Sequence, residues 1–339
     1  MATIKDIAKA AKVSVGTVST ILRDLPSPLI TDKTRRRVKA LAEELGYRPN
    51  PMAQSLRSRR THTIGMIVPN MHGFFMAERL DEIERYFSDQ GFFLLTACSY
   101  ADAERELKLL DQLGRGRCDG LLIWPTGALV GPNVDALRAL EVPFVLLNGP
   151  ADSPFPGSHE NRRKAVGMMV DHLVSRGRRR LQLQVMGPEH PENFRARERR
   201  QAFLDALLAR HLPQLEPAVV SWDRSGQDGL RHAQLIAAMP ERPDAVMCGT
   251  DMAALELIDA LDRAGLRVPG DLSVVGWGNL PTSAYARVPL TTLETGLSMI
   301  SRKSAETLHL LIQCKVKKQK PPRFASYQVD PELLIRASG

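Results

Sequence analysis

Six side chains with aromatic rings or hydrogen-bonding groups stand directly after short apolar runs. They are Trp124, Asn148, Trp222, Asp251, Trp277 and Asn279. In a sheet of parallel strands the carboxyl ends meet at one edge, where such folds bind ligands. Because aromatic faces stack on sugar rings while polar groups bind hydroxyls, the set predicts a carbohydrate site. For any one aromatic residue core packing is an equally good explanation, but packing explains less well why all three tryptophans follow predicted strands.

Reactive groups in catalytic spacing are missing from the sequence. It contains no GxSxG elbow, P-loop, HExxH motif or paired CxxC, and GWGN at 276–279 lacks the third glycine of a dinucleotide fingerprint. Scattered cysteines favour buried free thiols over disulfides or a zinc site. These are Cys98, Cys118, Cys248 and Cys314. We therefore expect no enzymatic activity, no catalytic residues, no cofactor and no metal.

The excess positive charge is confined to the start of the chain. The 339 residues carry a net charge of +8, and residues 1–60 hold 13 Lys and Arg against 5 Asp and Glu. A short basic module on a neutral body favours contact with a polyanion. Tyr47 is the only aromatic residue in this stretch, which disfavours a membrane surface. No apolar run reaches the ~20 residues that cross a bilayer, and no signal peptide is evident, so we expect a cytoplasmic protein.

Three short helices are predicted in the basic module. The first covers 4–11 with Thr3 as its N-cap, and the second covers 15–22. Because only a short connection joins them, they predict a helix-turn-helix. A third helix over 31–45 ends at Gly46, a usual C-terminal capping residue.

The next segment, 48–62, begins with a proline-containing stretch and is basic. Its Leu56 either packs on a neighbouring domain or enters a DNA minor groove as a wedge. From Thr63 onward apolar runs alternate with amphipathic helices, which is typical of βαβ units and a mostly parallel sheet. The predicted strands cover 64–68, 92–96, 120–123, 144–147, 181–185, 218–221, 245–248 and 273–276. Predicted helices include 76–90, 104–113, 164–176, 197–210, 229–238 and 252–264. The pattern suits two similar α/β lobes with a ligand crevice between them.

Several segments closely resemble the LacI/GalR family of bacterial transcriptional regulators. They are TIKDIAKAAKVSVGTVSTIL, TRRRVKALAEELGYRPNPMAQSLRSRRTHTIGMIVP, CDGLLIWP, CGTDMAALELIDAL, VPGDLSVVGWGN and PLTTLE. The resemblance covers nearly the whole chain. It implies an all-α helix-turn-helix headpiece and an α/β two-lobed core with parallel sheets, similar to periplasmic binding proteins. The implied domains are a headpiece over 1–47, a hinge helix over 48–62 and a core over 63–339, with an N-lobe of about 63–158 and 290–322 and a C-lobe of about 159–289 and 323–339.

The resemblance also implies which residues contact DNA. Val15, Gly16 and Thr20 would read base edges in the major groove. Those expected nearer the phosphates or at the helix start are Thr3, Ser14, Thr17 and Ser19. Many relatives have Arg in place of Thr20, so the operator should differ at the corresponding base.

Two further features follow from the same resemblance. Lys12 replaces a frequent Gly in the turn, where a positive φ would disfavour a side chain. Hinge residues of the family fold as paired helices on the operator, and a leucine pair opens a central base step. The matching residues are Asn50, Ala53, Gln54 and Leu56.

In the core, the resemblance adds Phe74, Phe75 and Arg199 to the effector-binding candidates. The arginine would point into the cleft and bind a carboxylate, phosphate or vicinal diol. Its neighbours are expected to be solvated or alternative occupants; they are Arg195, Arg197 and Arg200. Two departures, Gly278 for a frequent Asp and Glu160 in a VDN-like position, leave a sugar acid or another polar metabolite open beside a sugar.

We therefore predict a homodimeric, sequence-specific repressor that binds pseudo-palindromic double-stranded operator DNA. A small polar effector, a sugar or sugar derivative, would modulate its operator affinity from between the lobes. One alternative is a solute-binding protein, which shares the core but needs an export signal and has no use for a basic helix-turn-helix. Another is a regulator whose core no longer binds ligand, with Gly278 recording the loss.

Overall fold

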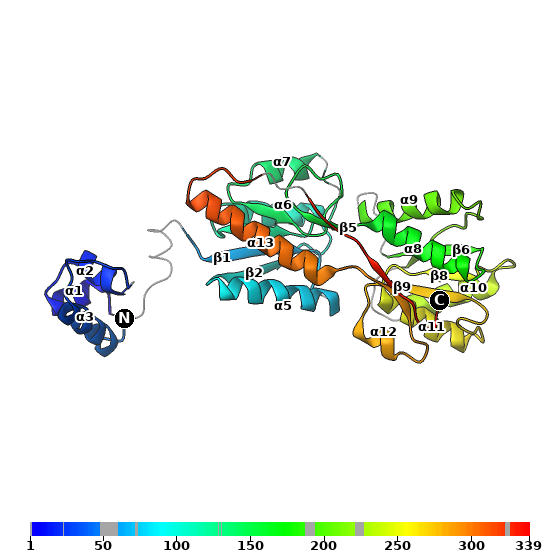
Figure 1. Ribbon diagram of the computed structural model, residues 1–339, viewed down its shortest axis with the longest axis horizontal. Coiled ribbons are helices and arrows are strands. Elements are labelled where there is room, and N and C mark those ends of the chain that lie inside the picture. The colour runs from blue at the N-terminus through cyan, green and yellow to red at the C-terminus, as the bar shows by residue number, and fades with distance from the viewer. Residues whose placement is uncertain are drawn as a thin grey trace. The chain divides into compact units, whose positions relative to one another are not determined.

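Two compact units, Met1–Thr61 and His62–Gly339, make up the chain in the computed structural model (Figure 1). The structure describes residues 2–22, 24–47, 60–71, 74–127, 129, 131–186, 194–220, 227–322 and 326–339. The first unit is all helical and the second is α/β with parallel sheets, which confirms the expected fold class. None of the helices described is both long and apolar enough to cross a membrane.

The headpiece consists of α1 (Ile4–Ala11), α2 (Val15–Leu22) and α3 (Asp32–Glu44). Thr3 caps α1 and forms a reciprocal capping box with Asp6. Apolar side chains spaced one helical turn apart pack the three helices into a small core. This core contains Ile7, Ala8, Ala11, Val18, Ile21, Val38 and Ala42. The predicted helix-turn-helix is confirmed, with boundaries shifted by a residue or two at the ends of α3.

The turn between α1 and α2 requires a left-handed residue, as the departure at Lys12 suggested. Lys12 has φ 51° and ψ 45°. Its backbone N–H donates to carbonyl groups of the last turn of α1. A side chain costs about 1 kcal/mol or more in this conformation, so the headpiece packing stabilises a turn that glycine would form without strain.

The N-terminal lobe is built on a parallel sheet in the order β2-β1-β3-β4. Its strands are β1 (Thr63–Val68), β2 (Phe93–Cys98), β3 (Gly120–Ile123) and β4 (Phe144–Leu146). Helices α5 (Phe74–Asp89) and α13 (Leu297–Val316) pack on one face, and α6 (Ala103–Gly114) and α7 (Pro132–Arg138) on the other. Gly120 permits the close approach of α13, because a Cβ there would lie 2.9 Å from the side chains of Leu308 and Ile312.

The C-terminal lobe contains a six-stranded sheet in the order β12-β10-β9-β8-β6-β7. Its strands are β6 (Leu181–Met186), β7 (Ala218–Val220), β8 (Ala245–Met247), β9 (Ser273–Trp277), β10 (Thr291–Glu294) and β12 (Glu332–Leu334). Only β12 runs antiparallel among these described strands. Helices α8 (Arg162–Ser175) and α9 (Phe194–Leu208) cover one face, and α10 (Gln227–Ala238) and α11 (Asp251–Arg263) the other. The short α12 (Pro281–Tyr285) follows β9.

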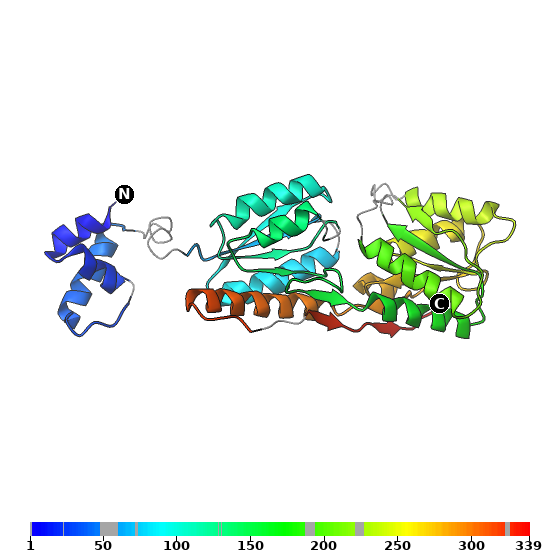
Figure 2. The same cartoon turned by 90° about the horizontal axis from the view of Figure 1, so that it is seen from above.

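Paired strands β5 (Ser158–Glu160) and β11 (Tyr327–Val329) connect the lobes. Figure 2 shows β11 leading from the N-lobe side, where α13 lies, toward the C-lobe. Strand β10 belongs to the C-lobe sheet, so the expected lobe boundary at 290 is wrong and the crossing follows Glu294. The sequence analysis also missed β5, β10, β11 and β12, because each of these short strands contains polar residues and none forms a continuous apolar run.

Candidate DNA interface and effector cavity

One face of α2 is exposed and the other is part of the headpiece core. Val15 is 40% exposed and Gly16 is also exposed, whereas Val18 is fully buried. Ser14 caps the helix, since its hydroxyl accepts the backbone N–H of Thr17 at 3.0 Å. The exposed face therefore presents the residues that the resemblance places at base edges.

Thr20 lies on this face as well, and its hydroxyl donates to the Gly16 carbonyl at 3.0 Å. That bond leaves the methyl group and the remaining oxygen lone pairs for a partner. Ser19 differs from the expectation, because it is only 6% exposed and lies on the buried side of α2. Thr3 is exposed, but its side chain is engaged with Asp6 at the start of α1, 2.7 Å from Oδ2.

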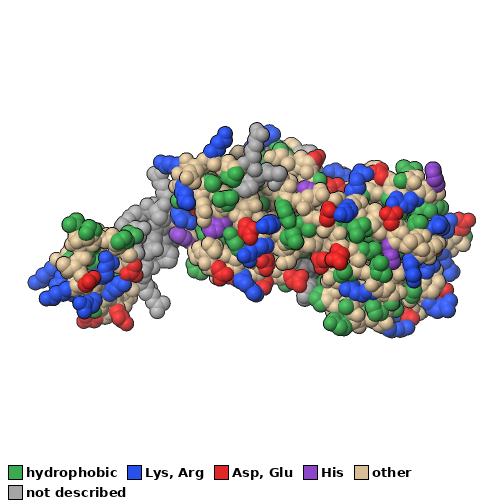
Figure 3. Space-filling model, in the orientation of Figure 1, with side chains coloured by type: hydrophobic (Ala, Val, Ile, Leu, Met, Phe, Trp, Pro, Cys, Tyr) green, Lys and Arg blue, Asp and Glu red, His purple; other side chains and the backbone are tan. Residues whose placement is uncertain are grey.

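Basic side chains of α3 mostly hold the headpiece together. Arg35 donates to the Leu25 carbonyl at 3.1 Å, and Lys39 lies 2.6 Å from Asp24. Arg37 donates to the carbonyl of Ala11 at 2.8 Å, which accepts at the end of α1. Lys and Arg side chains gather on the visible face of the headpiece (Figure 3), where they create a positive field.

The hinge candidates Asn50, Ala53, Gln54 and Leu56 lie outside the described residues. So does Trp222 in the core, and nothing is described of the side chains of Phe74 and Phe75. Among the residues described, no group of His, Cys, Asp and Glu has the arrangement of a metal site. The four cysteines are free thiols, with Cys98 half-buried and the others buried.

A cavity of about 320 Å³ lies inside the core, between the lobes. Trp124, Asn148, Arg199 and Trp277 line it, so the structure brings together four of the side chains that the sequence singled out. Further lining comes from Pro69, Arg79, Ala101, Thr126, Glu160, Leu183, Gln184, Val185, Arg195, Ala196, Gly249, Thr250, Gly278, Thr295 and Leu297. The volume suits a small molecule.

Glu160 of β5 lies at the centre of the charged groups. Its side chain is 3% exposed and lies 3.1 Å from Arg162 Nε and 3.3 Å from Arg199 Nη2. The indole N–H of Trp277 donates to its other oxygen at 3.3 Å. Burial alone would raise the pKa of Glu160, but Arg162, Arg199 and Arg79 hold it at about 2. Glu160 is therefore an anion that the guanidinium groups surround.

Arg79 of α5 is a cavity residue that the sequence analysis missed. It is 3% exposed, and its guanidinium lies 3.9 Å from the centre of the Trp124 ring. Burial lowers the pKa of Arg79 to about 9. Its Nε and Nη1 atoms have no hydrogen-bond partner among the described residues.

Arg195 also lines the cavity, so of the two options that the sequence left for it, a solvated side chain or an alternative occupant of the cleft, it takes the second. It donates to the carbonyls of Pro125 and Asn148 at 3.0 and 3.1 Å, and its Nε has no partner among the described residues. Burial lowers its pKa well below the ordinary value. Arg195 lies in the first turn of α9 and Arg199 one turn later, and residues four apart share a helix face.

Two other candidates do not reach the cavity. Asp251 is fully buried at the start of α11, where its carboxylate accepts the Leu280 N–H at 2.7 Å and the Ser283 hydroxyl at 2.6 Å. A third hydrogen bond comes from the Thr292 hydroxyl. Asn279 bonds Glu294 at 3.1 Å and accepts from Arg336 at 2.9 Å. Both side chains are engaged in holding the loop after β9.

Gly278, the residue between Trp277 and Asn279, lines the cavity. Its φ of +121° is favourable for glycine and strained for other residues. At this position, where the resemblance led us to expect an aspartate, the cavity wall therefore has no side chain.

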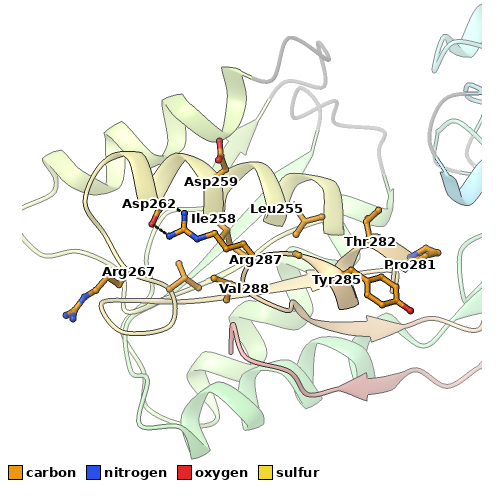
Figure 4. Close-up of a pocket in the computed structure, with 12 residues that line it drawn as sticks. Leu255, Ile258, Asp259, Asp262, Arg267, Pro281, Thr282, Tyr285, Arg287 and Val288 are labelled. Carbon is orange, nitrogen blue, oxygen red and sulfur yellow. Dashed lines mark hydrogen bonds and ion pairs between the residues drawn. The ribbon is translucent and has the colours of Figure 1, made fainter.

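A second groove, of about 640 Å³, lies on the surface of the C-lobe between α11 and residues 281–288 (Figure 4). Its lining is apolar at Leu255, Ile258 and Val288. Arg287 spans to Asp262 through two contacts of 2.7 Å. It is larger than the cavity between the lobes, but none of its described lining residues has a buried polar atom without a hydrogen-bond partner.

The chain is similar to known regulators over its whole length. Residues 3–50 match a family described as bacterial regulatory proteins, lacI family, and residues 170–338 match a periplasmic binding protein-like domain. The HTH-type transcriptional repressor PurR of Aliivibrio fischeri (strain ATCC 700601 / ES114) is 31% identical over 345 residues, with 100% of this chain and 98% of the relative covered. The PurR repressor of Aliivibrio salmonicida (strain LFI1238) is 29% identical over 339 residues, covering 100% and 99%.

Solved structures agree with the fold. The lac repressor dimer bound to operator and the anti-inducer ONPF matches with a TM-score of 0.84 and 24% identity, over 99% of this chain and 98% of that chain. The architecture of a helical headpiece followed by a two-lobed core is therefore common to both chains.

Proposed function

Since the chain belongs to the lacI family of bacterial regulatory proteins, we propose that it is a sequence-specific transcriptional repressor whose operator affinity responds to a small polar effector. The observation that carries the proposal is the exposed face of α2, with Val15, Gly16 and Thr20 on a helix-turn-helix scaffold. A recognition helix of this kind enters the major groove. No catalytic role is part of the proposal, and the site of action is the cytoplasm.

Selection of bound fragments from random duplex DNA tests the operator proposal. We expect a symmetric site to be enriched at 150 mM salt, where nonspecific binding to phosphates has weakened. Binding that vanishes as salt rises, with no motif enriched in the presence or absence of candidate effectors, would contradict it.

Thr20→Arg should change the operator base that α2 prefers. Arginine binds guanine O6 and N7 with two hydrogen bonds, whereas Thr20 offers a methyl group and a hydroxyl already bonded to Gly16. We expect about 1–3 kcal/mol in favour of guanine at that position. Repeating the selection with the variant measures the shift. Ala40→Arg, an equal charge change at an exposed position of α3, should leave the motif unchanged.

The hinge completes the DNA-binding proposal. On the strength of the family resemblance we assign Asn50, Ala53, Gln54 and Leu56 to contacts at the operator centre, with Leu56 as the wedge between base pairs. Thr3, Ser14 and Thr17 belong to the backbone-contacting end of the headpiece, since each lies at an exposed or half-exposed helix start.

We assign effector binding to the cavity between the lobes. Trp124, Asn148, Arg199 and Trp277 line it together with Arg79 and Arg195. A molecule that contacts both lobes binds the closed and open arrangements with different affinity, and this difference can be transmitted to the operator. Induction and corepression are both thermodynamically possible, because coupling free energy can have either sign.

A homodimer would place two recognition helices on a pseudo-palindromic operator. Its proposed contact surface includes the edge strand β2, where Phe93 is 78% and Leu95 45% exposed, and α12, where Tyr285 is 88% exposed. Figure 1 shows β2 and α12 on the same long side of the core. An edge strand with exposed apolar side chains invites association with another chain.

Tyr285→Asp should weaken the dimer by about 2 kcal/mol or more, because a buried aromatic residue at an interface contributes at this level and a carboxylate there loses hydration. Sedimentation equilibrium of the purified protein measures the dissociation constant. Leu208→Asp is the control, since Leu208 is 58% exposed on α9, away from α12 in Figure 1. Equal dissociation constants for wild type and Tyr285→Asp would place the interface elsewhere.

A further inference from the structure

The cavity between the lobes has more positive than negative groups. The guanidinium groups at or beside it belong to Arg79, Arg162, Arg195 and Arg199. Two carboxylates contact them directly: Glu160 contacts Arg162 and Arg199, and Glu198 lies 2.6 Å from Arg162 Nη1. A third, Glu106, accepts the backbone N–H of Thr126 at 2.7 Å rather than an arginine, and burial raises its pKa.

Arg79 and Arg195 account for the excess of positive charge at the cavity. Neither has a direct carboxylate partner among the described contacts, since Arg195 donates only to carbonyl groups and Arg79 lies against Trp124. Nε of each arginine and Nη1 of Arg79 have no hydrogen-bond partner among the described residues. Buried charges and donors are normally paired, so these atoms indicate a missing partner rather than a finished structural contact.

The tryptophans orient the arginines. The Arg79 and Arg195 guanidiniums lie 3.9 and 5.3 Å from the centre of the Trp124 ring, and that of Arg199 lies 3.8 Å from that of Trp277. A guanidinium held over a ring face by cation–π attraction still has its N–H groups available to bind an anion. Ring faces that the sequence assigned to a sugar therefore carry cations instead.

We propose that the effector is a small organic oxyanion, a phosphate ester or a carboxylate, whose charged group binds between Arg79, Arg195 and Arg199. This inference rests on the proposed function, because it specifies the ligand of the same cavity. Arginine matches both anions through paired, charge-assisted hydrogen bonds. The unpartnered Nε and Nη1 of Arg79 offer donors from the N-lobe, while α9 supplies donors from the C-lobe. An anion would thus draw the lobes together.

Calorimetric titration of the full-length protein tests the proposal with matched probes. One probe is inorganic phosphate. The others form two sets, each with a neutral sugar, its acid and its phosphate ester: glucose, gluconate and glucose 6-phosphate, and ribose, ribonate and ribose 5-phosphate. We expect saturable binding of inorganic phosphate and of anionic members, with neutral sugars bound at least tenfold more weakly. Preference for the phosphate esters or for the acids identifies which oxyanion is used. Neutral sugars bound as tightly as the anions, or no binding of any probe, would overturn the proposal.

Arg79→Gln should weaken anion binding roughly 10- to 100-fold, the effect of losing hydrogen bonds to a charged group. Arg85→Gln on the same helix is the matched control, because Arg85 is exposed and pairs with Asp81 at 2.8 Å. A purely structural Arg79 would show a lower melting temperature of the unliganded variant and unchanged anion affinity. We expect instead that Arg79→Gln binds anions more weakly and that its melting temperature without ligand is not lowered, since glutamine removes a buried charge that has no carboxylate in direct contact.

Operator binding by the same variants separates this inference from the proposed function. Arg85→Gln, the exposed control outside the cavity, should bind the selected operator as the wild type does. Operator binding without any anion binding would overturn the oxyanion proposal and leave the repressor in place. Anion binding without any operator binding would overturn the repressor proposal and leave the oxyanion site in place.

Discussion

Glu160→Gln is expected to lower the free energy of unfolding of the core by about 3–5 kcal/mol, the cost of leaving buried charges without their partner. Glu160 is the carboxylate that contacts both Arg162 and Arg199, and it is 3% exposed. Glutamine keeps the size and one oxygen acceptor but removes the negative charge, so four guanidinium groups would repel one another in a poorly hydrated space. Urea unfolding of the full-length protein, followed by tryptophan fluorescence, measures the change.

Glu198→Gln is the control, because Glu198 contacts the same Arg162 but is 34% exposed and water can replace it. Glu198→Gln should lower the free energy of unfolding far less than Glu160→Gln does.

The pH dependence of stability gives a second test. The pKa of Glu160 is about 2, below the ordinary 4.5, so its contribution is complete above pH 4.5 and disappears as pH falls toward 2. The stability of Glu160→Gln should therefore lack the decrease that protonation of Glu160 causes in the wild type below pH 4.5. Equal stability of the two variants would show that Glu160 does not neutralise the cluster.

Asp251→Ala is expected to lower the free energy of unfolding by about 3 kcal/mol or more, through the loss of its hydrogen bonds. The buried carboxylate accepts from Leu280, Ser283 and Thr292, which lie in the loop after β9, in α12 and in β10. Alanine would leave these donors unsatisfied and would release the loop that follows Trp277. Thermal and urea unfolding measure the loss, and calorimetry measures effector affinity.

Asp259→Ala on the same helix is the matched control, since Asp259 is 64% exposed and pairs only with Arg263 among the contacts described. It should change stability by less than about 0.5 kcal/mol. If Asp251→Ala left stability intact and abolished effector binding, Asp251 would be a ligand-binding residue, as its position after a strand predicted.

Local patterns carried most of the fold prediction. Thr3 and Ser14 are side-chain caps, and Gly46 adopts φ +60° after α3, so the headpiece helices could be located from capping chemistry and apolar spacing. Buried runs such as β1 and β3 are readable because parallel central strands are apolar on both faces. Helix α7 and strands β5, β11 and β12 are short, and their stability depends on partners distant in sequence.

The cavity residues divide in the same way. Position after a strand identified Trp124, Asn148 and Trp277, because parallel strands bring their carboxyl ends to one edge. It failed for Asp251 and Asn279, which occupy equivalent positions but bond the neighbouring loop. Sequence position specifies where a side chain begins, and packing decides where its polar end lies.

By itself, the sequence determined the family, the helix-turn-helix, the alternation of strands and helices in the core and the edge at which a ligand could bind. Only the tertiary structure decided the charge of the cavity. Arg79 and Arg195 lie in helices, where an arginine ordinarily faces water, and Glu160 lies in a three-residue strand. Their meeting depends on how two lobes and a connecting strand pack together, and the pKa values and unpaired donors of a buried cluster arise from that burial.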